Sequence, residues 1–335
     1  MKAVVLYEHG GPDKLRYEEH FPDPNVGPGE VILRVKAASL NYHDVFTRRG
    51  MPGIRLKFPV IIGLDLAGDI VEVGPGVDSW AIGERVLVDP INRVAGGLMG
   101  ETIHGGLAEY CRVAVHQLIR LPAEVSYEAA AALPVAYGTA HRMMLTQGHI
   151  TAGEKVLILG ASGGVGTCCL FLAKMAGAHV VACASSDDKL RKLRDFGADH
   201  VINYATHDFV QEIHILYGKP HRRRYEGGVD MVINYTGGDT WAKSLRCLRR
   251  GGRMLTCGAT AGYDPKTDLR FIWTFELHII GANGWDRDDL EALLRLVQQE
   301  KIRPVIDTVL PLHEAREGLR LLEDRAVIGK VIITP

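Results

Sequence analysis

The pattern of hydrophobic and polar positions divides the chain into two regions with different periodicities. Up to about residue 120, short runs of aliphatic and β-branched residues follow one another closely, separated by Pro and Gly. The runs that we predict as strands are 4–6, 30–35, 67–73 and 84–88. Because no helical pattern lies between them, they predict a folded-over antiparallel barrel or sandwich.

From Ser126 onward, strand-like and helix-like segments alternate. Ser126 is a good N-cap for a helix that has Glu128 in its first turn and alanines behind it. The segments that follow are predicted as strand 155–159, helix 165–175, strand 179–184, helix 189–196, strand 200–203, strand 230–234, helix 241–248, strand 253–257 and strand 278–281. Alternation of this kind predicts a parallel, doubly wound sheet.

The rest of the chain is predicted to hold helix 288–299 and strand 329–333, and we expect it to rejoin the first region. The length of 335 residues also fits two domains. We therefore expect a strand-rich domain of residues 1–123 and 284–335, and a Rossmann domain of residues 124–283. The predicted fold class is α/β.

Composition changes this picture little. Hydrophobic residues make up 47% and charged residues 24%, which is typical of a soluble protein with a sizeable core. The net charge of -1 gives no electrostatic reason to expect a nucleic-acid or membrane partner. The start is too polar after Leu6 for a signal peptide, and no run approaches the ~18 apolar residues of a membrane helix. We expect a cytoplasmic protein.

The cysteines do not indicate a metal site. There are six in the chain, and none of them forms a CxxC pair. Scattered cysteines without a signal peptide are typically reduced and buried, whereas thiolate ligands come at short regular spacings. We interpret them as buried free thiols.

A glycine-rich loop follows the predicted strand 155–159 and precedes an apolar helix. It reads Gly160, Ala161, Ser162, Gly163, Gly164, Val165, Gly166. A side chain at Gly163 or Gly164 would block the approach of a pyrophosphate to backbone N–H groups at the positive end of the helix, and Gly166 lets the helix pack on the strand. The first glycine of the usual GxGxxG falls on Ala161. The loop predicts a dinucleotide site, with a glycine-rich structural turn as the alternative.

The end of the second strand of the alternating region bears on the choice of cofactor. An acid there binds the ribose 2′-hydroxyl of NAD, but Ala184 occupies the position. Ser185, Ser186 and Lys189 follow, Tyr204 adds a hydroxyl after the third strand, and all four suit a 2′-phosphate. The contrary observation is the pair 187–188, two aspartates that we interpret as helix caps. NADPH is favoured over NADH.

Together with the strand-rich first region, four stretches resemble the medium-chain dehydrogenase/reductase superfamily, and more narrowly its zinc-free quinone oxidoreductase and enoyl reductase branch. The stretches are 38–44, 59–68, 105–110 and 160–166. The resemblance implies a GroES-like substrate domain, a small-molecule substrate and a homo-oligomer, either a dimer or a tetramer. It also implies that backbone groups at Gly258, Ala259 and Asn283, which follow later strands, contact the nicotinamide.

The resemblance also shows which residues are missing. Zinc alcohol dehydrogenases of this superfamily hold their catalytic metal through a Cys, a His and a further Cys. The matching positions here are Asn41, Leu64 and Val135, and residues 89–105 lack the cysteines of a structural-zinc lobe. Leucine and valine do not coordinate zinc, and an asparagine amide is a poor zinc ligand. We expect no metal.

Without a metal to stabilise an alkoxide, reduction of a carbon–carbon double bond conjugated to a carbonyl is favoured. The resemblance places Tyr42 at the nicotinamide, as first candidate for proton donor or holder of the carbonyl, with water as the alternative donor. Asn41 is the second candidate, and Asp44 is expected to pair with Arg48 one turn later. The predicted function is NADPH-dependent reduction of an enone, enoyl thioester or quinone. The alternatives are a metal-free carbonyl reductase and an NADPH-binding protein without turnover.

Overall fold

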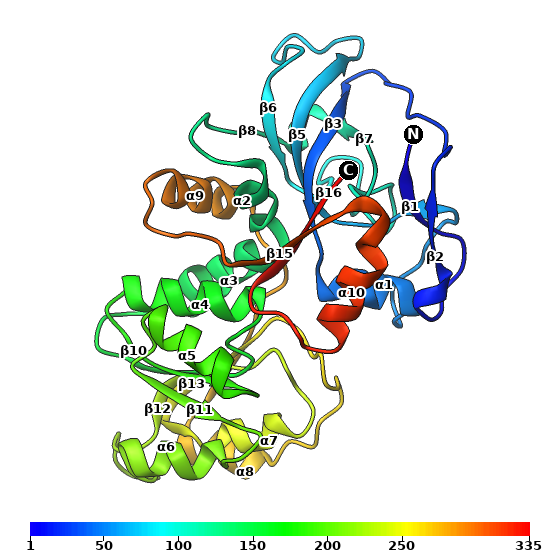
Figure 1. Cartoon of the computed structure of the whole chain (residues 1–335). Coiled ribbons are helices and arrows are strands. Elements are labelled where there is room, and N and C mark those ends of the chain that lie inside the picture. The colour runs from blue at the N-terminus through cyan, green and yellow to red at the C-terminus, as the bar shows by residue number, and fades with distance from the viewer. The chain divides into compact units, whose positions relative to one another are not determined.

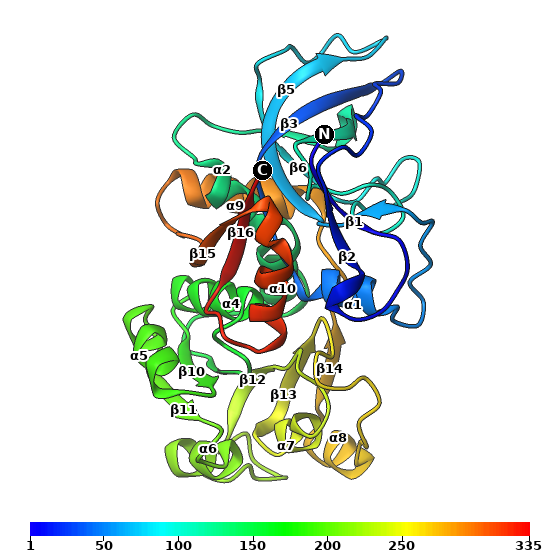
Figure 2. The same cartoon turned by 45° about the vertical axis from the view of Figure 1, so that its right-hand side comes forward.

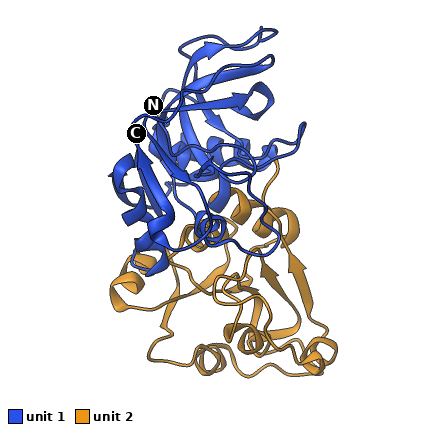
Figure 3. Cartoon of the chain, turned by 90° about the vertical axis from the view of Figure 1, so that its right-hand side faces the viewer, with its two compact units in different colours: residues 1–136, 287–335 blue, residues 137–286 orange.

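The computed structural model describes residues 1–335 and divides into two compact units (Figure 3). Unit 1 comprises residues 1–136 and 287–335, and unit 2 comprises residues 137–286. The boundaries therefore lie later than the expected ones at 123/124 and 283/284. The reason is helix α2 (Tyr127–Ala131), which begins after Ser126 as predicted but packs against strands of unit 1. The Ser126 Oγ accepts a hydrogen bond from the Ala129 N–H at 3.1 Å.

Unit 1 contains two sheets, a large one and a small one. The large sheet has the order β15 (Ile306–Pro311), β16 (Lys330–Thr334), β3 (Glu30–Ser39), β5 (Asp65–Val73), β6 (Arg85–Val88), β8 (Leu118–Arg120), with β7 (Tyr110–Ala114) also paired to β3. The small sheet has the order β2 (Leu15–Glu18), β1 (Ala3–Leu6), β4 (Val60–Ile61). Antiparallel pairing dominates, and β3 and β5 run side by side over most of their length (Figure 2).

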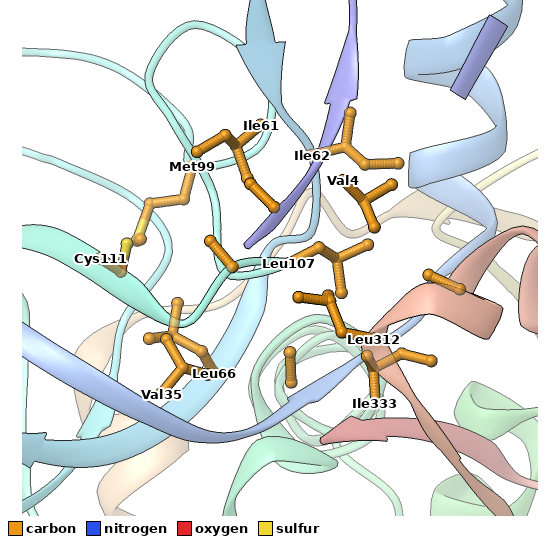
Figure 4. Close-up of a cluster of buried hydrophobic side chains, with 14 of the residues drawn as sticks. Val4, Val35, Ile61, Ile62, Leu66, Met99, Leu107, Cys111, Leu312 and Ile333 are labelled. Atoms are coloured by element: carbon orange, nitrogen blue, oxygen red, sulfur yellow. The ribbon is translucent and has the colours of Figure 1, made fainter. Parts of the chain in front are cut away.

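The last strand of the chain rejoins the first region, as expected. Strand β16 pairs antiparallel with β3, and Ile332 lies opposite Ser39. Side chains from both ends of the chain therefore share one core, in which Val4, Leu107 and Ile333 are buried together (Figure 4). Strand β15 beside β16 was not predicted, because its half-buried alternation carries little apolar signal.

Three more helices belong to unit 1: α1 (Tyr42–Arg49), α9 (Arg287–Gln298) and α10 (Ala315–Glu323). Helix α1 ends at Gly50, whose φ of 81° is in the left-handed region that favours glycine. Helix α1 packs against α10, so segments from opposite ends of the sequence meet here as well.

Unit 2 is built on one six-stranded parallel sheet. Its order is β11 (His200–Asn203), β10 (His179–Ala184), β9 (Lys155–Ile158), β12 (Val229–Ile233), β13 (Leu248–Thr256), β14 (His278–Gly281). The helices are α3 (Thr139–His141), α4 (Gly164–Met175), α5 (Asp187–Asp195), α6 (Phe209–Tyr217), α7 (Thr240–Leu245) and α8 (Leu269–Phe275). They cover both faces of the sheet (Figure 1). The predicted α/β fold class, a doubly wound sheet with a separate strand-rich domain, is confirmed.

The direction of the strand order reverses between β9 and β12, where β9 has β10 on one side and β12 on the other. In doubly wound sheets, ligands bind at the carboxyl ends of the strands beside such a reversal. The glycine-rich loop follows β9, so it lies at this point. None of the helices has both the length and the apolar character that crossing a membrane requires.

Candidate active site

The glycine-rich loop turns sharply between β9 and helix α4. Gly160 has a φ of 64°, in the region that favours glycine, and the Gly163 N–H closes the turn on the Gly160 carbonyl oxygen at 3.0 Å. Helix α4 then runs for 12 residues from Gly164, with its N-terminal N–H groups at the loop. A helix N-terminus reached over a bend of this kind is suited to a phosphate group.

Gly166 and Gly163 of this loop differ in whether the packing of the chain leaves room for a side chain. A Cβ at Gly166 would lie 2.6 Å from the Ala161 Cα and from the Gly160 carbonyl oxygen, so packing alone excludes a side chain there. A Cβ at Gly163 would meet nothing closer than 3.6 Å, and its φ of -79° suits any residue. Neither strain nor packing within the chain requires glycine at 163. A glycine that the chain itself does not require is what the close approach of a ligand to the backbone needs.

Tyr235 supports the glycine-rich loop by a hydrogen bond to its backbone, and this residue was not predicted from the sequence. Its hydroxyl donates to the Gly160 carbonyl oxygen at 2.6 Å, and burial raises the pKa of this phenol well above its usual value. The residue follows β12, directly after Asn234. The Asn234 side-chain oxygen accepts from the N–H groups of Thr236 and Gly237, both at 3.0 Å. The signal was the run 234–238 at the end of a predicted strand, beside the reversal point.

The residues proposed for a 2′-phosphate lie at the ends of neighbouring strands. The Tyr204 N–H donates to the Ala184 carbonyl oxygen at 3.2 Å, which brings the ends of β10 and β11 together. Ser185 and Ser186 directly follow Ala184 and are half-buried. The Ser186 Oγ caps helix α5 by accepting from the Lys189 N–H at 3.5 Å. Ser186, rather than the aspartates that follow it, is thus the N-cap.

A backbone hydrogen bond connects the loop after β12 with the loop after β13. The loop after β13 contains Gly258 and Ala259, which the resemblance assigns to the nicotinamide. The Thr260 N–H donates to the Tyr235 carbonyl oxygen at 3.2 Å. A Cβ at Gly258 would meet nothing closer than 3.7 Å, so at Gly258, as at Gly163, packing does not require glycine. Ala259 lies against Gly237 in the same pair of loops. Asn283 follows β14, two residues beyond Gly281.

In unit 1, Tyr42 begins helix α1 and Asn41 precedes it. Tyr42 is half-buried with its ring edge-to-face on Phe46, and its hydroxyl makes no hydrogen bond to the protein. Asn41 is only 6% exposed. Its side-chain N–H₂ group donates to Asp65 at 2.8 Å and to the Ser39 carbonyl oxygen at 3.4 Å. Both N–H groups of the Asn41 amide are thus engaged within the protein.

The expected ion pair between Asp44 and Arg48 does not form. Arg48 is buried and instead donates to Glu323 on α10 and to the Gly10 carbonyl oxygen, at 2.5 and 2.9 Å. The Asp44 carboxylate accepts from the Asn41 N–H at 2.7 Å through Oδ2, while Oδ1 has no partner. Burial raises the pKa of Asp44 to about 6. The spacing of one helical turn predicted an ion pair between Asp44 and Arg48, but Arg48 pairs with Glu323 on α10 instead.

The positions that the resemblance aligns with zinc ligands do not fit the metal. Leu64 is buried, and neither Leu64 nor Val135 offers a donor atom. The Asn41 Oδ1, the one oxygen in the set, accepts from the Lys330 ammonium at 2.5 Å. No group of three or more His, Cys, Asp or Glu side chains in the chain is arranged to hold a metal ion.

A glycine loop on the first strand of a doubly wound sheet, with a separate strand-rich unit, defines a two-domain protein of the dehydrogenase and reductase class. Two family models match it: the alcohol dehydrogenase GroES-like domain over residues 27–123 and the zinc-binding dehydrogenase domain over residues 164–299. The chain belongs to the medium-chain dehydrogenase/reductase superfamily.

Individual relatives cover the whole chain. It is 32% identical to an acryloyl-coenzyme A reductase of Sulfurisphaera tokodaii, over 100% of both chains. The crystal structure of an NAD-dependent alcohol dehydrogenase is similar over 100% of both chains, with 35% identity and a TM-score of 0.91. The structure of a 2-octenoyl-CoA carboxylase reductase, in complex with NADP and 2-octenoyl-CoA, has 28% identity and a TM-score of 0.86, covering 99% of this chain and 87% of that one.

Proposed function

We propose that this chain is a zinc-independent, NADPH-dependent reductase of carbon–carbon double bonds conjugated to a carbonyl, with enoyl thioesters of CoA as the favoured substrates. The observation that carries the proposal is the set of residues at the metal-ligand positions. An aliphatic pair and an amide bonded to an ammonium group do not supply the Lewis acid that alkoxide formation uses. Reduction of a conjugated double bond needs only hydrogen-bond donors at the carbonyl oxygen.

The glycine loop supports the cofactor half of the proposal. At Gly163 and Gly258 an added Cβ would make only ordinary contacts, so the fold does not require glycine there. Glycine at such positions is expected where the backbone approaches a dinucleotide. When bound, NADPH supplies the hydride that adds to the β-carbon of the substrate. Ser185, Lys189 and Tyr204 would hold the 2′-phosphate, and no acid occupies the position of Ala184 that would favour NADH.

Tyr42 is the residue that supports the part of the proposal concerning the substrate. Its hydroxyl has no partner in the protein, so it is free to donate a hydrogen bond to the carbonyl oxygen and to stabilise the enolate. The proton for the α-carbon then comes from Tyr42 or from water. The network around Asn41 keeps the start of α1, and with it Tyr42, in a fixed position.

The relatives support the substrate class and also keep a second candidate open. The acryloyl-coenzyme A reductase and the complex with 2-octenoyl-CoA favour an enoyl thioester. The similarity to an NAD-dependent alcohol dehydrogenase favours a carbonyl reductase. Oxidation of NADPH at 340 nm with crotonyl-CoA, an enone and a quinone tests the proposal. Saturated product from crotonyl-CoA or the enone supports it, and an allylic alcohol from the enone supports the carbonyl reductase.

The role of Tyr42 is tested by Tyr42→Phe, with Tyr225→Phe on an exposed loop as the matched control. We expect kcat for crotonyl-CoA to fall by about 10- to 100-fold in Tyr42→Phe, because an oxyanion donor is lost. The control should keep wild-type activity. If kcat is unchanged in Tyr42→Phe, then water, and not Tyr42, supplies the proton and the hydrogen bond to the carbonyl oxygen. NADPH oxidation absent with every substrate, despite tight binding, would favour a protein that binds NADPH without turnover.

The cofactor preference is tested with Ser185→Asp and Lys189→Gln. The aspartate repels a 2′-phosphate and accepts from a 2′-hydroxyl, so it should lower the ratio of kcat/KM for NADPH to that for NADH by at least about tenfold. Lys189→Gln should lower kcat/KM for NADPH alone. The control Lys192→Gln removes the same charge from an exposed position of the same helix. A wild-type preference for NADH would contradict this part of the proposal.

A further inference from the structure

Unit 1 contains a buried ammonium group. Lys330, on strand β16, is 2% exposed although lysine is almost never buried unless it is paired. Its Nζ donates to the Asn41 Oδ1 at 2.5 Å, to the Leu40 carbonyl oxygen at 2.9 Å and to the Asp65 carboxylate at 3.3 Å. The partners fill its three donor positions, so this lysine is fully bonded inside the domain.

Asp65 completes the cluster and is not exposed at all. Its Oδ2 accepts from the Ser39 hydroxyl and from the Asn41 side chain, each at 2.8 Å, in addition to Lys330. Its Oδ1 accepts from the Val135 N–H at 3.0 Å. One carboxylate therefore joins the end of β3, the start of α1, the segment after α2 and strand β16.

These are the segments that carry the positions aligned with zinc ligands. Asn41 and Val135 are themselves such positions, and Asp65 is the direct neighbour of the third, Leu64. A metal ion would join the segments through three side chains. Here an ammonium and a carboxylate join them through hydrogen bonds, and the positive charge comes from the chain itself.

We propose that Lys330 and Asp65 are positioning residues that replace a metal as the internal cross-link of unit 1 and hold Asn41 and Tyr42 for the reaction. The part that concerns Tyr42 rests on the proposed function. The cross-link itself does not, because it follows from the contacts of Lys330, Asp65 and Asn41 alone.

A double-mutant cycle tests the cross-link. Lys330→Met and Asp65→Asn each leave a buried charge without its partner, so each should raise the equilibrium constant of unfolding in urea at least about 100-fold. The double variant leaves neither charge, and it should be at least tenfold less destabilised than the product of the two single effects. Additive effects would overturn the proposal.

The matched control is the partly exposed pair of Lys36 and Asp69, whose charged atoms are 3.5 Å apart and whose side chains are 38% and 26% exposed. Lys36→Met and Asp69→Asn, alone and together, should change the unfolding constant by about fivefold or less, because an ion pair that solvent reaches contributes little. Coupling in this pair as large as that between Lys330 and Asp65 would show that the buried cluster has no special role.

Substrate kinetics separate positioning from general loss of structure. Under conditions in which Lys330→Met is folded by circular dichroism, kcat/KM for crotonyl-CoA should fall at least tenfold while the Kd for NADPH stays within twofold of wild type. Unchanged kinetics would overturn the positioning role. If wild type reduces no substrate, the proposed function fails, whereas the double-mutant cycle still decides the cross-link.

Metal analysis gives a readout that does not depend on turnover. We expect the purified chain to hold far less than one equivalent of zinc, and added zinc sulfate or EDTA to leave its unfolding midpoint unchanged. Stoichiometric zinc, or a midpoint that EDTA lowers, would overturn the proposal.

Discussion

The glycine loop of unit 2 and the polar cluster of unit 1 prepare their sites in opposite ways. The loop works by leaving side chains out, so that a bend at Gly160 and space at Gly163 expose backbone N–H groups. The cluster works by burying side chains, with Lys330 and Asp65 bonded to each other and to the start of α1. The proposed nucleotide site relies on backbone donors, whereas the cluster supplies its own charges.

The difference shows where each site is sensitive to change. Backbone donors at a helix N-terminus cannot be removed by substitution, so the loop is vulnerable mainly to added volume. Buried charges tolerate little loss, because removing one partner leaves the other uncompensated. The following experiments test this contrast, from the largest expected effect to the smallest.

Added volume at Gly166 should have the largest effect. The Cβ of Gly166→Val would lie 2.6 Å from two backbone atoms of the turn, so the loop must open. We expect a loss of about 3 kcal/mol or more in the free energy of unfolding and at least a 100-fold weaker Kd for NADPH. Urea unfolding and fluorescence titration measure the two quantities.

The matched variant Gly163→Ala adds a methyl group where the chain has room. Its free energy of unfolding should stay within about 1 kcal/mol of wild type, whereas NADPH binding should weaken at least tenfold. Equal losses of stability in the two variants would contradict the distinction between packing and ligand space. Unimpaired NADPH binding in Gly163→Ala would place the pyrophosphate elsewhere.

The pH dependence of Asp44 should be the next largest effect. Burial raises the pKa of Asp44 to about 6, above the value near 3.9 of an unfolded chain, so the folded state binds the proton more tightly. This stabilisation is complete at low pH and is lost as the pH rises through about 6. From pH 4 to 7, wild type should lose about 2 kcal/mol relative to Asp44→Asn. Urea unfolding of both proteins across this range measures it, and a constant difference would contradict the assignment.

The smallest effect is expected for Tyr235→Phe. The substitution removes one hydrogen bond to the Gly160 carbonyl oxygen and keeps the ring. We expect a loss of about 1 kcal/mol in the free energy of unfolding and a several-fold weaker Kd for NADPH. Tyr204→Phe, at the other end of the proposed nucleotide site, should weaken NADPH binding without changing stability. A loss of stability there as large as in Tyr235→Phe would show that the two tyrosines do not differ in role.

Most of unit 2 could be predicted because its signals are local. Strand–turn–helix alternation produced six strands that the structure contains, and the loop 160–166 was recognised from its own composition. Helices α6 and α8 were missed, although each begins after an aspartate N-cap, Asp208 or Asp268, whose side chain accepts hydrogen bonds from N–H groups of the first turn.

The cluster in unit 1 could not be predicted because its members are far apart in sequence. Asn41 and Asp65 become neighbours when β5 pairs with β3, and Lys330 joins them only when β16 pairs with β3. A lysine inside the apolar strand 330–334 was the one local sign of a buried charge. Likewise, the Asp44–Arg48 pair was expected from helical spacing, whereas Arg48 bonds to Glu323, which is 275 positions away.

The pairing of β16 with β3 also constrains the order in which the chain can fold during synthesis. Unit 2 lies between the two parts of unit 1, so all of its strands leave the ribosome before Lys330 does. Until that residue arrives, Asp65 and the amide of Asn41 lack the cation that completes their network, and Ala38 and Ser39 of β3 lack their strand partner. Unit 2 is therefore free to form during translation, whereas unit 1 is complete only after its final strand has been made.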